Sequence, residues 1–137
     1  MTEQHAYPDS QRVELDQFIL ATDQSVLDVG CWQGGFGAAL KRKRPGCVVW
    51  AIESDREGAA VAATRFDRVI NGRFPEEMPV EEHLDLVVFL DVLEHLVDPW
   101  SALRHASSLL RPGDVVVASI PNVRHVSVTF PLLARGL

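Results

Sequence analysis

Two acidic side chains on either side of a glycine-rich segment are the first residues that could do chemistry. Asp28 lies inside the apolar run that precedes Gly30, and Glu53 closes the next apolar run, about twenty residues further on. A carboxylate at the end of a second strand is placed to accept hydrogen bonds from a ribose diol. A carboxylate beside the glycines repels phosphate and suits a cation or an amine. The pair therefore predicts a ribose-containing ligand that carries a positive charge.

The glycines themselves do not follow the patterns of phosphate-binding loops. In a G-x-G-x-x-G register starting at Gly30 the third position is Trp32, and in a register starting at Gly35 the sixth position is Leu40. No lysine followed by Ser or Thr comes after the glycines, as a P-loop requires. A nicotinamide-dependent oxidoreductase is therefore disfavoured. A ligand with a ribose, an ammonium and a sulfonium but no phosphate fits both carboxylates, and S-adenosylmethionine answers that description.

Alternating strand and helix patterns must position these residues. Strands are expected at Ser25 to Val29, Cys47 to Ile52, Arg68 to Ile70, Leu84 to Leu90 and Val115 to Ile120. Helices are expected from Asp9 or Ser10 to about Thr22, from Gly35 to Arg44, from Asp55 to Phe66 and from Asp98 to Leu110. Strands separated by helices pair in parallel through right-handed crossovers. The sequence thus predicts an α/β fold, a Rossmann-like open parallel sheet with helices on both faces and about five strands in the order 3-2-1-4-5.

Composition limits the classes of function that remain. A chain of 137 residues is long enough for one domain, and its net charge of −6 argues against contact with a nucleic-acid backbone. No apolar run has the length of a membrane span, and no secretory apolar segment starts the chain. The two cysteines form no CxxC motif, and the histidines form no HExxH pair, so we expect no metal site. A cytoplasmic protein with no membrane partner is the expectation.

Three stretches of sequence together resemble class I S-adenosylmethionine-dependent methyltransferases. They are "VLDVGCWQGGFGAAL", "AIESD" and "FLDVLEHLVDPWSALRHASSLLRPGDVVVASIPNV", and the likeness extends from about Tyr7 to Leu137. It is nearest to the bacterial branch found beside, or fused to, glycosyltransferases. The resemblance implies methyl transfer from S-adenosylmethionine to an oxygen or nitrogen of a small molecule or a sugar or glycan precursor, with S-adenosylhomocysteine as product.

The resemblance also implies roles for individual residues. Asp28, Gly30, Cys31 and Gly34 would contact the methionine moiety of the cofactor. Glu53 would bind the ribose, and Ser54 would lie near the adenosine. Asp91 and Val92 would border the sulfonium, and Tyr7 would cover the cofactor from the N-terminal segment. Glu94 and His95 would face the substrate opening and, with Asp91, are the candidate catalytic residues, because histidine is a natural general base. Alternatively, Glu94 complements a helix dipole and His95 is a packed or hydrogen-bonded residue.

Two residues of the expected cofactor site depart from the family pattern. Trp32 stands where the family has the middle glycine, which adopts a left-handed backbone at little cost. Either the loop takes another path with Trp32 turned outward, which we favour, or the indole ring fills part of the pocket. Asn71 stands near the position where the family usually offers an acidic residue to the adenine amino group, and Arg73 is unexpected there. Asn71 still offers hydrogen bonds to the base.

The end of the chain is the third departure. The family fold carries two more strands after the fifth, so a single domain is expected here that lacks them, with an N-terminal segment and helix over 1–24, a cofactor-binding core over 25–121 and a tail helix over 122–137. We expect the tail to cover the apolar edge of the fifth strand, or a second chain to pair there as a homodimer. The alternative to a methyltransferase is therefore a non-catalytic binding or interaction module that keeps the fold, dimerising through this edge.

Overall fold

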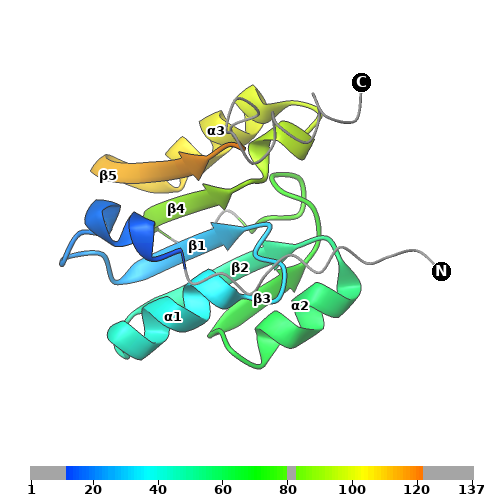
Figure 1. Cartoon of the computed structure of the whole chain (residues 1–137). Helices are drawn as coiled ribbons and strands as arrows, with labels where there is room; N and C mark the ends of the chain where they lie inside the picture. The colour runs from blue at the N-terminus through cyan, green and yellow to red at the C-terminus, as the bar shows by residue number, and fades with distance from the viewer. Residues whose placement is uncertain (1–11, 80–82, 122–137) are drawn as a thin grey trace, which may run out of the picture.

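The computed structural model describes residues 12–79 and 83–121 and shows a five-stranded, all-parallel sheet in the order β3-β2-β1-β4-β5 (Figure 1). The strands are β1 (Ser25–Val29), β2 (Val48–Glu53), β3 (Arg68–Asn71), β4 (Leu84–Leu90) and β5 (Leu110–Ser119). The helices are α1 (Gly35–Lys43), α2 (Arg56–Ala63) and α3 (Pro99–Ser108), with 3-10 helices η1 (Val13–Phe18) and η2 (Leu93–His95). The predicted fold class and strand order are confirmed.

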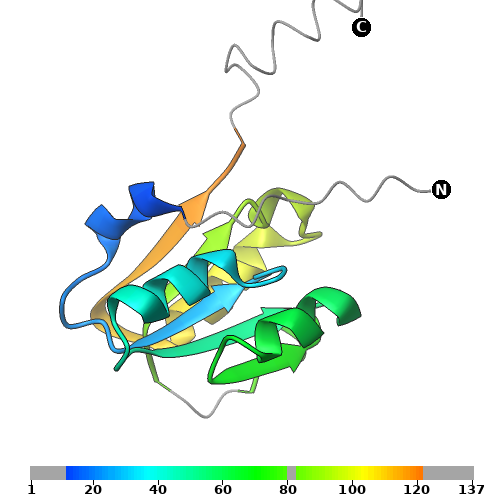
Figure 2. The same cartoon turned by 60° about the horizontal axis from the view of Figure 1, so that its bottom comes forward.

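Both faces of the sheet are buried, because successive strand residues point to opposite faces and both sets are apolar. In β4, Leu86 and Val88 belong to the core beneath α1 and α2, whereas Val87 and Phe89 belong to the core beneath α3. Figure 2 shows α1 and α2 on the near side of the sheet and α3 behind it. The continuous apolar run of β4 thus reflects its cover on two sides, as the sequence predicts.

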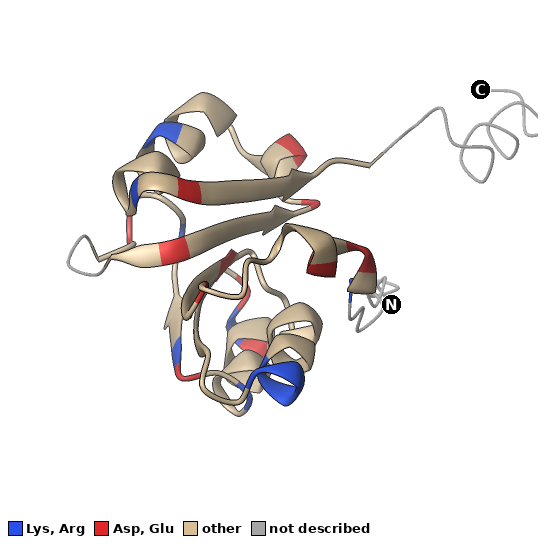
Figure 3. Cartoon of the chain, turned by 90° about the vertical axis from the view of Figure 1, so that its left-hand side faces the viewer, with Lys and Arg blue, Asp and Glu red and all other residues tan. Residues whose placement is uncertain are grey.

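The helix starts follow the sequence signals closely. The Asp55 carboxylate accepts a hydrogen bond from the Gly58 N–H at 2.7 Å and caps α2. The Asp98 carboxylate accepts from the Ser101 N–H at 2.9 Å and caps α3, whose first residue is a proline. The last turn of α1 is basic, and Figure 3 shows this cluster at the end of the helix away from the glycine-rich loop. Cations there complement the negative end of the helix dipole.

The expected N-terminal helix is shorter than the pattern predicted. Within the described residues it is only the 3-10 helix η1, and Ile19 after it is already extended. The Asp23 carboxylate accepts a hydrogen bond from the Leu20 N–H at 2.7 Å, and such local side-chain bonds compete with helical ones. The prediction of a helix reaching about Thr22 is therefore wrong.

Strand β5 begins five residues earlier than predicted, at Leu110 instead of Val115. The Arg111–Gly113 segment was expected to separate helix from strand, yet it lies within β5, where the pairing with β4 is irregular between Leu84 and Leu86. A proline is tolerated there because β5 is an edge strand in the described sheet and its outer side needs no N–H donor. Val115 in β5 and Ile120, directly after it, are exposed by 37% and 63%. The tail over 122–137, which was expected to cover this edge, lies outside the described residues, and so does Tyr7, which was expected to cover the cofactor.

The packing of α1 against the ring of Phe66, which follows α2, gives a test of the core. A Cβ added at Gly37 would lie 2.4 Å from Cζ of the buried Phe66 ring, whereas nothing lies within 4 Å of a Cβ added at Gly46. Gly37→Ala should lower the free energy of unfolding by roughly 1–3 kcal/mol in urea denaturation, although alanine is the better helix former, because overpacking costs more than propensity gains. Gly46→Ala is the matched control and should be neutral or stabilising by at most about 1 kcal/mol. Equal effects of the two substitutions would contradict this packing.

Candidate functional site

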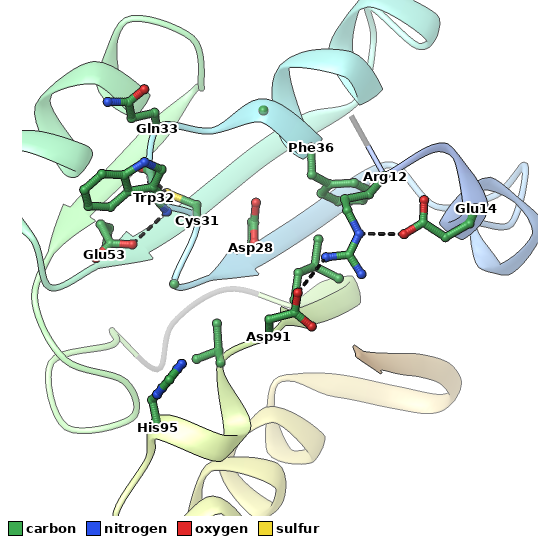
Figure 4. A pocket seen from close by; sticks show the side chains of 14 residues that line it. Arg12, Glu14, Asp28, Cys31, Trp32, Gln33, Phe36, Glu53, Asp91 and His95 are labelled. Atoms are coloured by element: carbon green, nitrogen blue, oxygen red, sulfur yellow. Dashed lines mark hydrogen bonds and ion pairs between the residues drawn. The ribbon is translucent and has the colours of Figure 1, made fainter. Parts of the chain in front are cut away.

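A cavity of about 570 Å³ opens at the carboxyl ends of β1, β2 and β4 (Figure 4). Its position follows from the topology, because β1 lies between β2 and β4, whose connections run on opposite faces of the sheet and part at this edge. The walls bring together most of the predicted site residues, namely Asp28, Gly30, Cys31, Trp32, Glu53, Asp91, Val92 and His95. Residues separated by more than sixty positions in the sequence thus meet at one site.

A second cavity of about 520 Å³ adjoins the first and shares Gly30, Val92 and His95 with it. Ser54, on the predicted adenosine side, lines this cavity together with Arg73 from the loop after β3. Asn71 lines neither cavity. Its side-chain amide donates to the backbone carbonyls of Glu53 at 2.9 Å and Ser54 at 3.2 Å, and so ties the ends of β2 and β3 together.

Asp28 is the most deeply buried charged residue of the first cavity, with 2% of its surface exposed. Its pKa is raised to about 8, chiefly by burial and also by the nearby Glu53 carboxylate, while the Arg12 guanidinium opposes the rise. Figure 4 shows this carboxylate in the middle of the cavity. A group in this state gains from a cationic ligand, since a nearby positive charge stabilises the ionised form.

Glu53 is also buried, with 7% of its surface exposed, and its carboxylate is held by backbone donors. One oxygen accepts from the Trp32 N–H at 2.7 Å and the other from the Asp55 N–H at 2.8 Å. An ionised carboxylate offers about four acceptor positions, so two remain for a ligand hydroxyl pair. The side chain is therefore oriented before any ligand arrives.

Trp32 keeps the left-handed backbone that a glycine would adopt, with φ of 52°. Its ring lies against the first turn of α2, since a Cβ added at Gly58 would be only 3.2 Å from the Trp32 Cε3 atom. The ring forms part of the cavity wall and the cavity persists beside it. Gly30 nearby is confined in a different way, because an added Cβ would meet Val92 at 2.6 Å. The tryptophan therefore replaces a glycine without closing the cavity.

Arg12 is one of the cavity residues that sequence reasoning missed, together with Glu14, Gln33, Phe36 and Leu90. Its guanidinium donates to Glu14 at 2.6 Å, to Asp91 at 3.2 Å and to the hydroxyl of Ser119 at 2.9 Å, and Figure 4 shows it reaching the cavity from the N-terminal segment. No motif marks this arginine. The available signal was electrostatic, because a site with several carboxylates needs a cation near it.

The residues after β4 divide into two groups. Asp91 has a left-handed backbone with φ of 57° and lines the first cavity, and His95 lines both cavities with 66% of its side chain exposed. Glu94 lines neither cavity, and its carboxylate lies 3.6 Å from Nε2 of His95. His95 is thus an exposed candidate base that borders both cavities, and the Glu94 carboxylate lies beside its imidazole ring.

The remaining predicted residues have other positions. Gly34 is the N-cap of α1 with φ of 89° and does not line the first cavity; a Cβ added there would lie 2.7 Å from Cζ of Phe66. Cys31 lines the cavity, and burial, reinforced by Asp28 and Glu53, raises the pKa of its thiol far above the usual range, so it is no nucleophile at neutral pH.

No group of three or more His, Cys, Asp or Glu that could hold a metal occurs among residues 12–79 and 83–121. No helix in that part of the chain is long and apolar enough to cross a membrane.

Comparison with known proteins agrees with this geometry. The family described as a methyltransferase domain matches residues 5–134, so the chain belongs to the class I S-adenosylmethionine-dependent methyltransferase family, as the sequence motifs predicted. The ubiquinone biosynthesis O-methyltransferase of Pseudomonas fluorescens (strain SBW25) is 28% identical over 128 residues, which are 87% of this chain and 53% of that protein. The enzyme of the same name from Pseudomonas paraeruginosa (strain DSM 24068 / PA7) is 32% identical, over 72% of this chain and 45% of that protein. The chain spans about half the length of these relatives.

Solved structures share the fold at low sequence identity. The plantazolicin methyltransferase BpumL, crystallised with a pentazolic desmethylPZN analog and SAH, has a TM-score of 0.79 at 15% identity, over 92% of this chain and 52% of that one. Coclaurine N-methyltransferase, bound to N-methylheliamine and SAH, has a TM-score of 0.67 at 20% identity, over 78% of this chain and 34% of that one. The Rossmann-like methyltransferase architecture is thereby confirmed.

The raised pKa of Asp28 predicts how stability depends on pH. Between about pH 4 and pH 8 the unfolded chain has lost the Asp28 proton while the folded chain retains it, so stability from this group falls as pH rises through that window. Asp28→Asn removes the titration at nearly constant volume. Urea denaturation at pH 5 and pH 8 should show a smaller loss of unfolding free energy for the variant than for the wild type. Parallel losses in both proteins would contradict a raised pKa at Asp28.

Proposed function

We propose that this chain binds S-adenosylmethionine in the two adjoining cavities and transfers its methyl group to an oxygen or nitrogen of a small-molecule acceptor. The observation that carries the proposal is the placement of two buried carboxylates, Asp28 and Glu53, at the ends of neighbouring parallel strands, with Arg12 on the other side of the same cavity. Few ligands combine a ribose, a cation and a carboxylate without a phosphate. S-adenosylmethionine does.

Each ligand group has a counterpart in the described residues. The free acceptor positions of Glu53 suit the two ribose hydroxyls, and the Asp28 carboxylate suits the ammonium. The Arg12 guanidinium and the N-terminal end of α1, which begins at Gly35, both favour the carboxylate of the amino-acid end. The second cavity, lined by Ser54 and Arg73, has room for the adenine. The donor set therefore fits the whole cofactor.

Catalysis in this site would depend chiefly on positioning. Bound S-adenosylmethionine supplies an electrophilic methyl group on its sulfonium. Asp91 accepts hydrogen bonds at both carboxylate oxygens, from Ser119 and Arg12, so it acts through its charge and not as a free base. His95 is exposed at the opening and is the residue that would take a proton from an acceptor hydroxyl. Orientation alone supplies roughly 7–11 kcal/mol in favourable cases.

The relatives favour oxygen as the accepting atom, because the two reported above are named O-methyltransferases. A neighbour of the same fold is named an N-methyltransferase, so nitrogen remains the alternative acceptor. A small phenol or a sugar hydroxyl is the acceptor class that we propose. An exposed histidine suits such an acceptor, since hydroxyls need a base when they attack.

Calorimetry with S-adenosylhomocysteine tests the proposal directly. The wild-type chain should bind it at micromolar concentration, and Glu53→Gln should weaken binding at least about tenfold, because a charge-assisted hydrogen bond to the ribose is lost. Glu57→Gln is the matched control on the exposed side of α2 and should leave affinity unchanged. NAD should not compete. Absence of S-adenosylhomocysteine binding up to millimolar concentration, or equal effects of the two glutamate variants, would overturn the assignment.

A second experiment separates the amino-acid end of the ligand from its nucleoside. Arg12→Met should weaken S-adenosylhomocysteine binding about tenfold or more, yet change the affinity for 5′-methylthioadenosine less than about twofold, because that ligand lacks the amino-acid end. Arg104→Met, on the exposed face of α3, is the control for the loss of one cation. Equal weakening of both ligands by Arg12→Met would show that Arg12 supports the fold of the site and not the carboxylate.

A further inference from the structure

Ser119, the last residue of β5, contacts two charged residues of the cavity although no motif assigns it a role. Its position follows from strand register, because the parallel pairing sets Ser119 beside Leu90 and hence next to Asp91. The Asp91 N–H donates to the Ser119 carbonyl at 3.1 Å and to its hydroxyl at 3.2 Å. The left-handed backbone of Asp91, with φ of 57°, is thereby fixed at the end of β4.

The hydroxyl of Ser119 also joins Asp91 to Arg12. It donates to Oδ1 of Asp91 at 2.9 Å and accepts from Nη2 of Arg12 at 2.9 Å, while Nη1 of Arg12 donates to Oδ2 of Asp91 at 3.2 Å. A serine hydroxyl has one proton to donate and two lone pairs to accept with. The hydroxyl proton is donated to the Asp91 carboxylate, and the two lone pairs accept hydrogen bonds from Nη2 of Arg12 and from the Asp91 backbone N–H. The hydrogen-bonding capacity of the hydroxyl is therefore fully used by these two residues.

This network governs where the positive charge of the cavity lies. Arg12 precedes η1. Its Nε donates to Glu14, a residue of the same N-terminal segment, whereas Nη1 and Nη2 donate to Asp91 and Ser119 at the ends of β4 and β5. Among the described contacts, those two bonds are the ones that join the guanidinium to the sheet. The charged residues that line the cavity are Arg12 and Glu14 from the N-terminal segment, Asp28 from β1, Glu53 from β2 and Asp91 after β4, with His95 beside them. Without the bonds to Asp91 and Ser119, Glu14 is the one side-chain partner left to the guanidinium among the described residues, and the position of the guanidinium relative to the sheet is no longer fixed.

We propose that Ser119 is a positioning residue of this site: its hydroxyl holds Arg12 and Asp91 in one arrangement, so that the guanidinium faces the carboxylate of the ligand and the aspartate faces its cationic centre. The inference rests on the proposed function for the identity of the ligand. The arrangement of Arg12 and Asp91 by Ser119 exists in the free protein and is testable there. Ser119 acts through its neighbours and touches neither the methyl group nor the acceptor.

Nitrogen-15 NMR of the full chain tests the arrangement without any ligand. The Nη protons of Arg12 should exchange slowly in the wild type, because both nitrogens are bonded to the sheet. Ser119→Ala and Ser119→Cys should each abolish those slow signals, since neither side chain replaces the hydroxyl and cysteine is a weak donor of similar size. Ser119→Thr should retain them. Ser107→Ala, at an exposed position of α3, is the matched control. Slow Arg12 signals in Ser119→Cys would overturn the proposal, whichever ligand the chain binds.

Calorimetry with two ligands then relates the arrangement to binding. Ser119→Cys should weaken S-adenosylhomocysteine about tenfold and leave 5′-methylthioadenosine within about twofold, with Ser119→Thr close to wild type. Equal loss for both ligands, or equal loss in the cysteine and threonine variants, would show that Ser119 only supports the strand end. If the wild type binds neither ligand, the proposed function fails, and the NMR result alone decides whether Ser119 positions Arg12.

Discussion

The reversal of strand order at β1 is the constraint on which the rest of this structure depends. The connection from β1 to β2 runs on one face of the sheet, and the helix that leads from β4 to β5 lies on the other. The loops after β1 and β4 therefore part where the strands end, and a cavity forms between them. Asp28, Glu53 and Asp91 all lie in or directly after strands at this edge, so the sheet fixes the positions of these three side chains.

A dense set of carboxylates at such an edge is stable only if its charge is balanced. Asp28 meets the problem by retaining its proton, with a pKa of about 8, whereas Glu53 stays engaged with two backbone N–H groups. Asp91 is compensated by Arg12, which the N-terminal segment brings back across the sheet. The three acids thus use three different physical solutions. Their separate environments allow one cavity to offer both a cation site and a hydroxyl-binding site.

Trp32 shows how the loop tolerates a residue that the family pattern disfavours. A left-handed backbone costs a non-glycine residue roughly 1–2 kcal/mol. The Trp32 N–H donates to a buried carboxylate, a charge-assisted bond of the stronger kind, and the ring packs beside Gly58. Gly58 has no side chain and so leaves space for the indole ring, which means that the large residue at position 32 and the small one at position 58 fit each other.

The sequence by itself determined the elements that carry the site and the acids within it. Apolar runs and capping residues such as Asp98 depend only on near neighbours, so the strand order, both α-helix caps and the placement of Asp28 and Glu53 at one edge could be predicted from it. Only the tertiary structure decided that Asn71 joins two strands, that Arg12 enters the cavity and that Ser119 holds it there. The reason is physical: those contacts join positions up to 107 residues apart, and strand register and side-chain direction fix them, which no local pattern records.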